Sequence, residues 1–373
     1  MRNGARATRI DVPLCVTALL LCLGGLAVVW SASSVLAIDR FGTPNAYFSR
    51  QLMFFGAGLV ACLGLANVPY TRWQEPVIAW GLALSALGGL AAVFAFPARN
   101  GAHRWLKLPG LSAQPSDLAK LALIILVANL LADSQRPGHG AGRGGLDWRM
   151  VRVIAVCGAT LALILAEPDL GTAVVLAGTL FLTLFLGGLA WRAILPVAGT
   201  GLLGLIAMIA FSPFRRARML AFLHPELTSD GAGYQIAQAK LALGAGGLTG
   251  KWFMGGSLRL LYLPEPHTDC IFASLGEETG LIGTTLVLLG FLLLIARGYK
   301  IADDAATPFG QYLAFGLTTL LATQAFFNLL VVTGLAPAKG IALPFLSYGG
   351  SSLVISLAAV GILLNISQHR RGA

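Results

Sequence analysis

The chain passes from Tyr262-Leu-Pro-Glu265-Pro-His267-Thr268-Asp269 directly into an apolar run that begins at Cys270. The run is long enough to cross a bilayer, and the prolines stiffen the approach to it. Carboxylates are costly close to hydrocarbon and are usually retained there for a function. We therefore expect a membrane helix with a functional carboxylate, Asp269, at its mouth.

Composition extends this expectation to the whole chain. Hydrophobic residues make up 56% of the 373 positions and charged residues only 11%, and the mean hydropathy is +0.77. Soluble domains carry about 25% charged residues, so composition indicates an integral membrane protein. Apolar runs of spanning length predict ten spans, near 13–32, 52–69, 77–97, 117–133, 151–167, 170–189, 193–212, 270–296, 310–333 and 346–366.

The predicted fold is an all-α integral membrane protein, a single polytopic domain over 1–373 with a large extracytoplasmic loop at 213–269 between the seventh and eighth helices. With the N-terminus inside, the inner segments hold 13 Lys and Arg and the outer segments 6, once the 6 in that loop are set aside. Because basic residues concentrate on the inner side, both termini are predicted to be cytoplasmic. A cleaved signal peptide over the first run is the alternative, and the spanning length of this run favours a retained helix.

Several features argue against other classes of site. The net charge of +10 suits inner loops and lipid head groups, so we expect no nucleic acid partner. No C-x-x-C or H-E-x-x-H pattern occurs, and the five cysteines indicate neither a disulfide framework nor a zinc site. The Gly-rich stretch 244–251 matches neither nucleotide-binding glycine pattern and is expected to form a flexible turn.

Two outer segments carry candidate binding groups. In 98–116, Arg104 and Trp105 precede a helix start at Pro115-Ser116, which places Lys120 about 5 Å inside the fourth span, where it either snorkels outward or finds a carboxylate. In the 213–269 loop, Gln235 and Gln238 share one face of a short interfacial helix. The same loop opens with an arginine cluster that is either a solvated face or an anion clamp for phosphate: Arg215, Arg216 and Arg218.

The third outer segment is rich in proline, glycine and serine. It runs over 333–352 and predicts irregular backbone at membrane depth, which is tolerated only where it lines a cavity or is buried in protein. Together with Glu167-Pro168-Asp169, it brings carboxylates, an amine and hydroxyl donors to the outer side. Two explanations stay open for Glu277 and Glu278 inside the eighth span: polar contacts between helices, which we favour, or part of the pocket.

These segments resemble the SEDS family, the polytopic peptidoglycan glycan polymerases represented by FtsW, RodA and SpoVE. The matching motifs are Arg104-Trp105, Gln114-Pro-Ser-Asp-Leu-Ala-Lys120, Glu167-Pro-Asp-Leu-Gly-Thr-Ala173, Gly233-Tyr-Gln235, Leu263-Pro-Glu265-Pro-His-Thr-Asp269 and Leu343-Pro-Phe-Leu-Ser-Tyr-Gly-Gly-Ser-Ser352. Within the family, 276–278 and 338–340 are more similar to FtsW, the division member. The chain departs from the family pattern at Asp117, usually Glu, at Cys270, usually aromatic, and at His224, commonly Asp or Asn.

The resemblance implies an inverting glycosyltransferase that polymerises lipid II outside the cytoplasmic membrane, with a lipid pyrophosphate as leaving group. The acceptor hydroxyl is a poor nucleophile and needs a carboxylate base, for which Asp269 is the candidate. We expect Lys120 to keep Asp269 ionised through charge pairing. The predicted substrate-binding residues are Arg104, Trp105, Asp117, Asp169, Arg215, Arg216, Arg218, Gln235, Gln238, Glu265, His267, Thr268, Lys339, Ser347, Tyr348, Ser351 and Ser352.

Positive charge for the leaving pyrophosphate comes from the arginines and Lys339, or from a divalent cation, Mg or Mn. The implied partners are lipid II, a class B penicillin-binding protein, which is a transpeptidase, and other divisome proteins in the bacterial inner membrane at the division septum.

Two other functions are compatible with the composition of this chain. A lipid II flippase would need alternating access and often inverted repeats, and a non-catalytic divisome scaffold would need no catalytic carboxylate.

Overall fold

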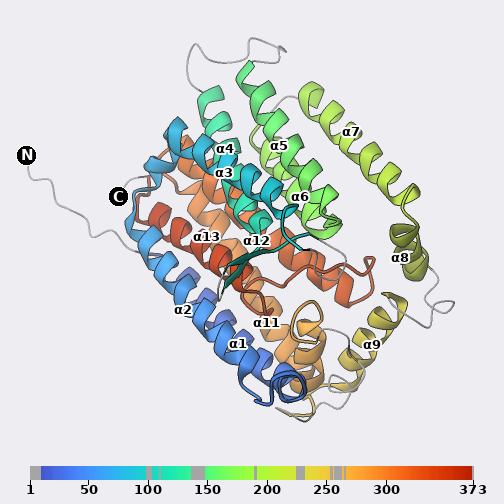
Figure 1. The fold of residues 1–373 in the computed structure, drawn as a ribbon. Coiled ribbons are helices and arrows are strands. Elements are labelled where there is room, and N and C mark those ends of the chain that lie inside the picture. Colours follow the sequence, from blue (N-terminus) through green and yellow to red (C-terminus); the bar gives the residue numbers. More distant parts are fainter. Residues whose placement is uncertain are drawn as a thin grey trace, which may run out of the picture.

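The computed structural model describes residues 10–97, 103–108, 111–135, 148–188, 191–223, 232–252, 255, 263 and 266–371. Its elements, in chain order, are α1 (Val12–Phe41), α2 (Ala46–Asn67), the 3-10 helix η1 (Tyr70–Gln74), α3 (Pro76–Val93), β1 (Leu106–Leu108), β2 (Leu111–Ala113), α4 (Pro115–Ser134), α5 (Trp148–Ala166), α6 (Leu170–Leu186), α7 (Trp191–Ala210), α8 (Pro213–Leu223), α9 (Ala232–Ala245), α11 (Ile271–Asp303), α12 (Pro308–Val332) and α13 (Gly350–Gln368). Figure 1 shows these helices running side by side in one bundle.

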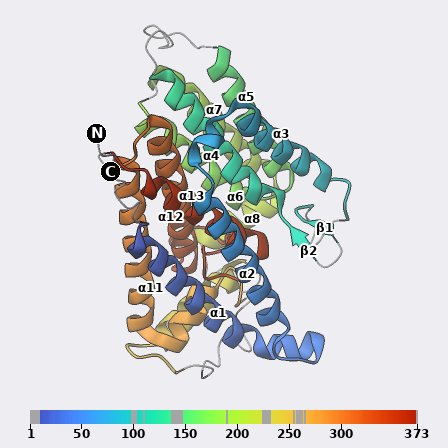
Figure 2. The same ribbon diagram turned by 90° about the vertical axis from the view of Figure 1, so that its left-hand side faces the viewer.

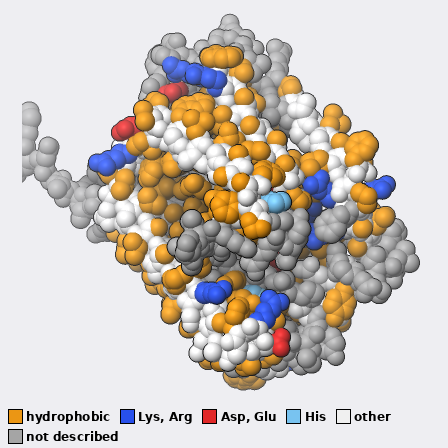
Figure 3. Space-filling model, viewed as in Figure 1, with side chains coloured by type: hydrophobic (Ala, Val, Ile, Leu, Met, Phe, Trp, Pro, Cys, Tyr) orange, Lys and Arg blue, Asp and Glu red, His pale blue; other side chains and the backbone are white. Residues whose placement is uncertain are grey.

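Each predicted span coincides with one helix, which confirms the all-α membrane fold. Eight of the described helices are long and apolar enough to cross a bilayer, and α6 and the 199–210 part of α7 are shorter apolar helices. Hydrophobic side chains cover much of the described surface in the space-filling view (Figure 3). The largest error in helix length is α1, which continues past the predicted 32 to Phe41 and ends where Gly42 takes a left-handed φ of 71°.

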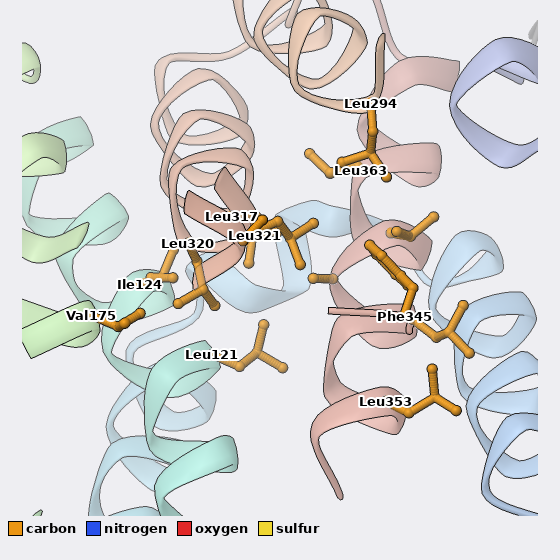
Figure 4. Packing of buried hydrophobic residues seen from close by; sticks show 14 of the residues in the cluster. Leu121, Ile124, Val175, Leu294, Leu317, Leu320, Leu321, Phe345, Leu353 and Leu363 are labelled. Atoms are coloured by element: carbon orange, nitrogen blue, oxygen red, sulfur yellow. The ribbon is translucent and has the colours of Figure 1, made fainter. Parts of the chain in front are cut away.

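The centre of the bundle is formed by α4, α12 and α13. In Figure 4, Leu121 and Ile124 of α4 approach Leu317, Leu320 and Leu321 of α12. Lipid tails are as apolar as these side chains, so close packing rather than hydrophobicity drives such contacts inside a membrane. A Cβ on Gly361 of α13 would lie 2.4 Å from the carbonyl oxygen of Cys62 in α2, so glycine is what allows these two helices to touch.

Helix α11 is broken in its N-terminal third, at Gly280, and the Gly-rich turn after α9 fills the break. Gly280 has φ 64° and ψ −159°, far from helical values. The N–H groups of Leu281 and Ile282 donate to the carbonyls of Gly247 and Leu248 at 2.9 and 3.2 Å. The expectation of a merely flexible turn at 244–251 is therefore wrong, because backbone freed by a broken membrane helix must find partners within the protein.

The outer segments contain more regular structure than the sequence indicated. β1 and β2 pair as an antiparallel hairpin within the 98–116 segment, which was not predicted; it lies at the edge of the bundle in Figure 2. The 213–269 loop contains α8 and α9, and α9 confirms the predicted short helix around Gln235. The 333–349 segment between α12 and α13 has no helix, as its prolines and glycines predicted.

Candidate active site

The residues just before α11 are held by an unbroken series of hydrogen bonds. The carbonyls of the three successive residues 267–269 accept, in order, from Tyr348 N at 2.8 Å, Ser347 Oγ at 2.7 Å and Asn328 Nδ2 at 3.0 Å. Two of these donors belong to the segment that leads into α13, and the third is on α12. We call residues 267–269 the base loop. Its backbone is fixed to two elements that are distant in sequence.

The Asp269 side chain is half-buried and faces the 333–349 segment on one side. A Cβ on Gly340 would lie 3.0 Å from Asp269 Oδ2, so the absence of a side chain there leaves room for the carboxylate. Arg218 of α8 lies within electrostatic reach. Burial and Arg104 lower the pKa of the Arg218 guanidinium, and the Asp269 carboxylate acts in the opposite direction. Asp269 is thus placed at a junction of α11, α8 and the segment before α13.

Two arginines from separate segments meet the C-terminal end of α5. Arg104 donates through Nε to the carbonyl of Glu167 at 3.1 Å and through Nη2 to that of Pro168 at 2.5 Å. Arg215 Nη2 donates to the carbonyl of Leu165 at 3.3 Å. Carbonyls at a helix C-terminus carry partial negative charge, which favours cations there. The end of α5 therefore gathers guanidinium groups from the hairpin segment and from α8.

Lys339 completes this group. Burial and then the charges of Arg218, Arg215 and Arg104 together lower the pKa of its ammonium to about 8, while Asp169 acts against them. We call Arg104, Arg215, Arg218 and Lys339 the cation cluster. Four cations face two described carboxylates, those of Asp169 and Asp269, so the cluster has surplus positive charge. A bound anion would relieve this repulsion, which is the property expected of a pyrophosphate site.

Arg216 does not belong to the cluster. Its side chain is exposed, and it is not among the groups that shift the pKa of Arg218 or Lys339. Arg215 and Arg218 are three residues apart and share one face of α8, whereas Arg216 projects from another face. Of the two interpretations that the sequence left open for the three arginines, the solvated face therefore applies to Arg216, and the anion clamp stays a prediction for Arg215 and Arg218.

Lys120 is paired differently from our expectation. Its Nζ lies 2.8 Å from Asp117 Oδ1 and donates to Gln324 Oε1 at 3.4 Å, and the cavity that it lines includes Asp117 and Gln324 but not Asp269. The pairing of Lys120 with Asp269 is therefore wrong as a direct contact. The nearer carboxylate stands one helical turn earlier on the same face of α4, and Asp117 reaches the lysine although it is one methylene shorter than the usual Glu.

Most of the predicted hydroxyl-bearing residues are engaged within the protein. Ser351 Oγ donates to Asp117 Oδ2 at 2.6 Å, and Ser352 Oγ accepts from Gln324 Nε2 at 3.4 Å. Ser347 Oγ accepts from Leu343 N at 2.8 Å in addition to holding the base loop. Ser347 thus ties the segment before α13 to the base loop, while Ser351 and Ser352 tie the first turn of α13 to α4 and α12.

The remaining predicted residues have mixed positions. His267 packs against the rings of Tyr47 and Tyr348, with centroids 4.6 and 5.5 Å away. Asp169 caps α6 by accepting from Thr172 N at 3.1 Å. Trp105 is half-buried beside Arg104, and Thr268 contributes its carbonyl to the base loop. On α9, Gln235 Nε2 donates to Cys270 Sγ at 3.3 Å, and Gln238 is half-buried. Glu265 and His224 lie outside the described residues.

Glu277 and Glu278 are fully buried beside the break in α11. Lys251 Nζ lies 3.5 Å from Glu277 Oε1, and Ser31 Oγ donates to Glu278 Oε1 at 2.5 Å. These contacts join α11 to α1 and to the Gly-rich turn, away from the cation cluster. They favour the hypothesis that both glutamates serve packing between elements.

Sequence reasoning missed two polar residues of the site and gave a third, Glu167, no role of its own. The missed residues, Gln324 and Asn328, are four residues apart on one face of the mainly apolar α12. Glu167 is fully buried, and neither carboxylate oxygen has a hydrogen-bond partner within the described part of the chain. Burial, then Asp169, raises the pKa of Glu167 to about 8 against the opposing effect of Arg104. Across the described ranges, no group of three or more His, Cys, Asp or Glu is arranged to hold a metal ion.

The chain is similar to known proteins over nearly its whole length. The family model of the FtsW, RodA and SpoVE cell cycle proteins matches residues 12–372. The probable peptidoglycan glycosyltransferase FtsW of Geobacter metallireducens is 39% identical, over 98% of this chain and 96% of that protein, and the stage V sporulation protein E of Bacillus subtilis is 37% identical, over 98% and 99%. A chain of a solved peptidoglycan synthase complex that coordinates polymerization and crosslinking superposes with a TM-score of 0.78 at 28% identity, over 98% and 99%.

Proposed function

Because the chain belongs to the FtsW, RodA and SpoVE family of cell cycle proteins, we propose that it is a peptidoglycan glycosyltransferase that polymerises lipid II into glycan strands for septal wall synthesis. The observation that carries this function is the position of Asp269, held by its backbone within electrostatic reach of a cluster of cations. A base beside an anion site is what transfer of a sugar from a lipid pyrophosphate requires.

The base loop and the cation cluster divide the reaction between them. Asp269 takes the proton of the acceptor hydroxyl as its oxygen attacks the anomeric carbon of the donor sugar. The bond from that carbon to the pyrophosphate oxygen breaks in the same displacement, which inverts the configuration. Arg104, Arg215, Arg218 and Lys339 stabilise the negative charge that develops on the leaving lipid pyrophosphate. Asp269 and the cluster together supply proton removal and charge stabilisation.

The sharpest test replaces the base without changing its shape. In Asp269→Asn the proton acceptor is lost, so polymerisation of labelled lipid II by the purified full-length protein should fall to background while lipid II binding persists. Polymer ladders from the wild type mean a polymerase. Lipid translocation without polymer would mean a flippase, and neither activity would mean a scaffold. Near-normal polymer from Asp269→Asn would remove Asp269 from the mechanism.

The same assay addresses cofactor and partner. A chelator, followed by Mg or Mn, tests whether a divalent cation assists the cation cluster.

The solved synthase complex couples polymerization with crosslinking, and this likeness supports a class B penicillin-binding protein as the partner of this chain. An external domain docked on the 213–269 loop would favour a state in which this loop closes over the lipid substrates. The partner should therefore raise the polymerisation rate, and changes in the loop should mimic that rise. Full activity without the partner, unaltered by its addition, would contradict this mechanism.

The proposed placement is the bacterial cytoplasmic membrane, with the site on the extracytoplasmic side, both termini cytoplasmic, and the protein at the division septum among other divisome proteins. Support comes from the basic inner loops and from the greater similarity to division proteins. A tag on either terminus that is accessible only after the membrane is permeabilised would agree with this topology.

A further inference from the structure

We propose that Asn328 is a positioning residue for polymerisation, whose side-chain amide sets the location of Asp269 and of the wall that faces it. The proposal rests on the assignment of Asp269 as the base. Asn328 lies on α12 and is 1% exposed. It does not reach the reacting atoms, so it acts through the backbone that it holds.

One amide group joins two segments of the site. Asn328 Nδ2 donates to the carbonyl of Asp269 at 3.0 Å and to the carbonyl of Ile341 at 2.6 Å. An amide nitrogen has two hydrogens, and both are used. The reverse orientation would set the amide oxygen against two carbonyl oxygens, so the contacts themselves fix which way the group points. Only a side chain with two donors on one atom fits this position.

The two acceptors belong to the residue that carries the carboxylate and to the segment that faces this carboxylate. The first is the carbonyl of Asp269 itself. The second, Ile341, follows Gly340, where a Cβ would come within 3.0 Å of Asp269 Oδ2. Asn328 therefore sets the distance between the carboxylate and its facing backbone. A displacement of about 1 Å in a reacting group can cost about a hundredfold in rate, so loss of this link should reduce the chemical step.

The surroundings of Asn328 make its polar side chain costly unless it is hydrogen-bonded. Its neighbours along α12 include Phe326, Phe327 and Leu329, so its value depends on which groups it joins. The chain supplies a matched comparison in Asn365 of α13, which is 3% exposed. Asn365 Nδ2 donates to the carbonyl of Ala66 at 2.8 Å, and its Oδ1 accepts from Tyr70 N at 2.8 Å. It joins α13, α2 and η1 and touches no group of the candidate site.

The experiment compares Asn328→Ala, Asn328→Asp, Asn365→Ala and Asn365→Asp in the purified full-length protein, using labelled lipid II, with thermal unfolding measured on the same samples. Asn328→Asp keeps the shape but leaves at most one donor, the hydroxyl of a protonated carboxyl, for the two acceptors. Both Asn328 variants should lose about tenfold or more in kcat per folded molecule, with the KM for lipid II changed by less than about twofold. The Asn365 variants should lose comparable thermal stability and keep kcat.

Four results would overturn the proposal. Wild-type kcat in Asn328→Asp would show that the donors do not matter. Activity losses that follow the folded fraction equally in the Asn328 and Asn365 variants would show a merely structural role. Activity in Asp269→Asn would remove the base assignment and this proposal with it, whereas an inactive Asp269→Asn beside a fully active Asn328→Ala would overturn the positioning role alone.

Discussion

The base loop and the cation cluster are adjacent, but they are held in different ways. Three carbonyls of the base loop accept hydrogen bonds from α12 and from the segment before α13, which belong to the densely packed centre. The cation cluster is carried by the hairpin segment, α8 and Lys339, and neighbouring arginines of the cluster help to lower the pKa values of Arg218 and Lys339. The comparison teaches that hydrogen bonds within the fold hold the backbone of the proposed base, whereas the cluster keeps a charge repulsion that the proposed pyrophosphate would relieve.

The first prediction tests the cluster. Arg218→Gln removes the cation that faces Asp269 and should lower kcat/KM by about a hundredfold, the size expected when a charge-stabilising group is lost. Arg216→Gln is the matched control, because it removes an equal charge from the exposed face of α8 and should leave kcat/KM near the wild-type value. Equal losses of kcat/KM in the two variants would show instead that Arg216 and Arg218 act together in one anion clamp. Initial polymerisation rates at several lipid II concentrations give the answer.

The second prediction tests the buried ion pair of Asp117 and Lys120. Lys120→Met leaves Asp117 buried without its ion-pair partner, which costs about 3–5 kcal/mol of unfolding free energy, and it also releases Gln324 from the lysine. We expect a lower melting temperature and about tenfold less activity. The double variant Asp117→Asn with Lys120→Met removes both charges and should recover most of the stability. If the single variant is stable but inactive, Lys120 acts on the reaction directly and not through Asp117.

The third prediction is a pH effect of the cluster. Lys339 has a pKa of about 8 instead of its ordinary 10.5, so its charge is lost as the pH rises through 8. The kcat/KM, which reports the free enzyme, should fall above pH 8, and the fall in kcat should come at higher pH because bound pyrophosphate raises the pKa. Lys339→Arg keeps its charge and should remove the fall. An unchanged alkaline fall in that variant would exclude Lys339 as its cause.

The smallest effect concerns Glu167, which lies beneath the cluster. Its pKa is about 8 in the fold against an ordinary 4.5, so the native protein keeps a proton that the unfolded chain releases between these values. Stability should therefore be greatest below pH 4.5 as far as this group is concerned, and should decline as the pH rises to 8. Glu167→Gln should flatten that decline in thermal unfolding. The same slope in the variant would show that other groups cause it.

The sequence by itself determined the membrane class, the ten helices and the candidate base. A long apolar run is stable in a bilayer as a helix, because a helix makes all its backbone hydrogen bonds within itself. The number of apolar helices could therefore be counted from the number of runs. Asp269 was identified for a related reason, since a carboxylate at a helix mouth is costly and therefore informative. The prolines and glycines of 333–349 likewise excluded a helix from their local geometry alone, although the last three residues of the predicted irregular segment 333–352 are the start of α13.

Only the tertiary structure decided which side chains meet. Lys120 pairs with Asp117 and not with Asp269, Arg216 is separated from Arg218, and the Gly-rich turn enters the broken α11. Asn328 gains its role because α12 passes between the base loop and Ile341, which are 72 residues apart in sequence. Hydrogen bonds and ion pairs act over a few ångströms, and the helix packing that brings distant residues within that range is not encoded in any single segment.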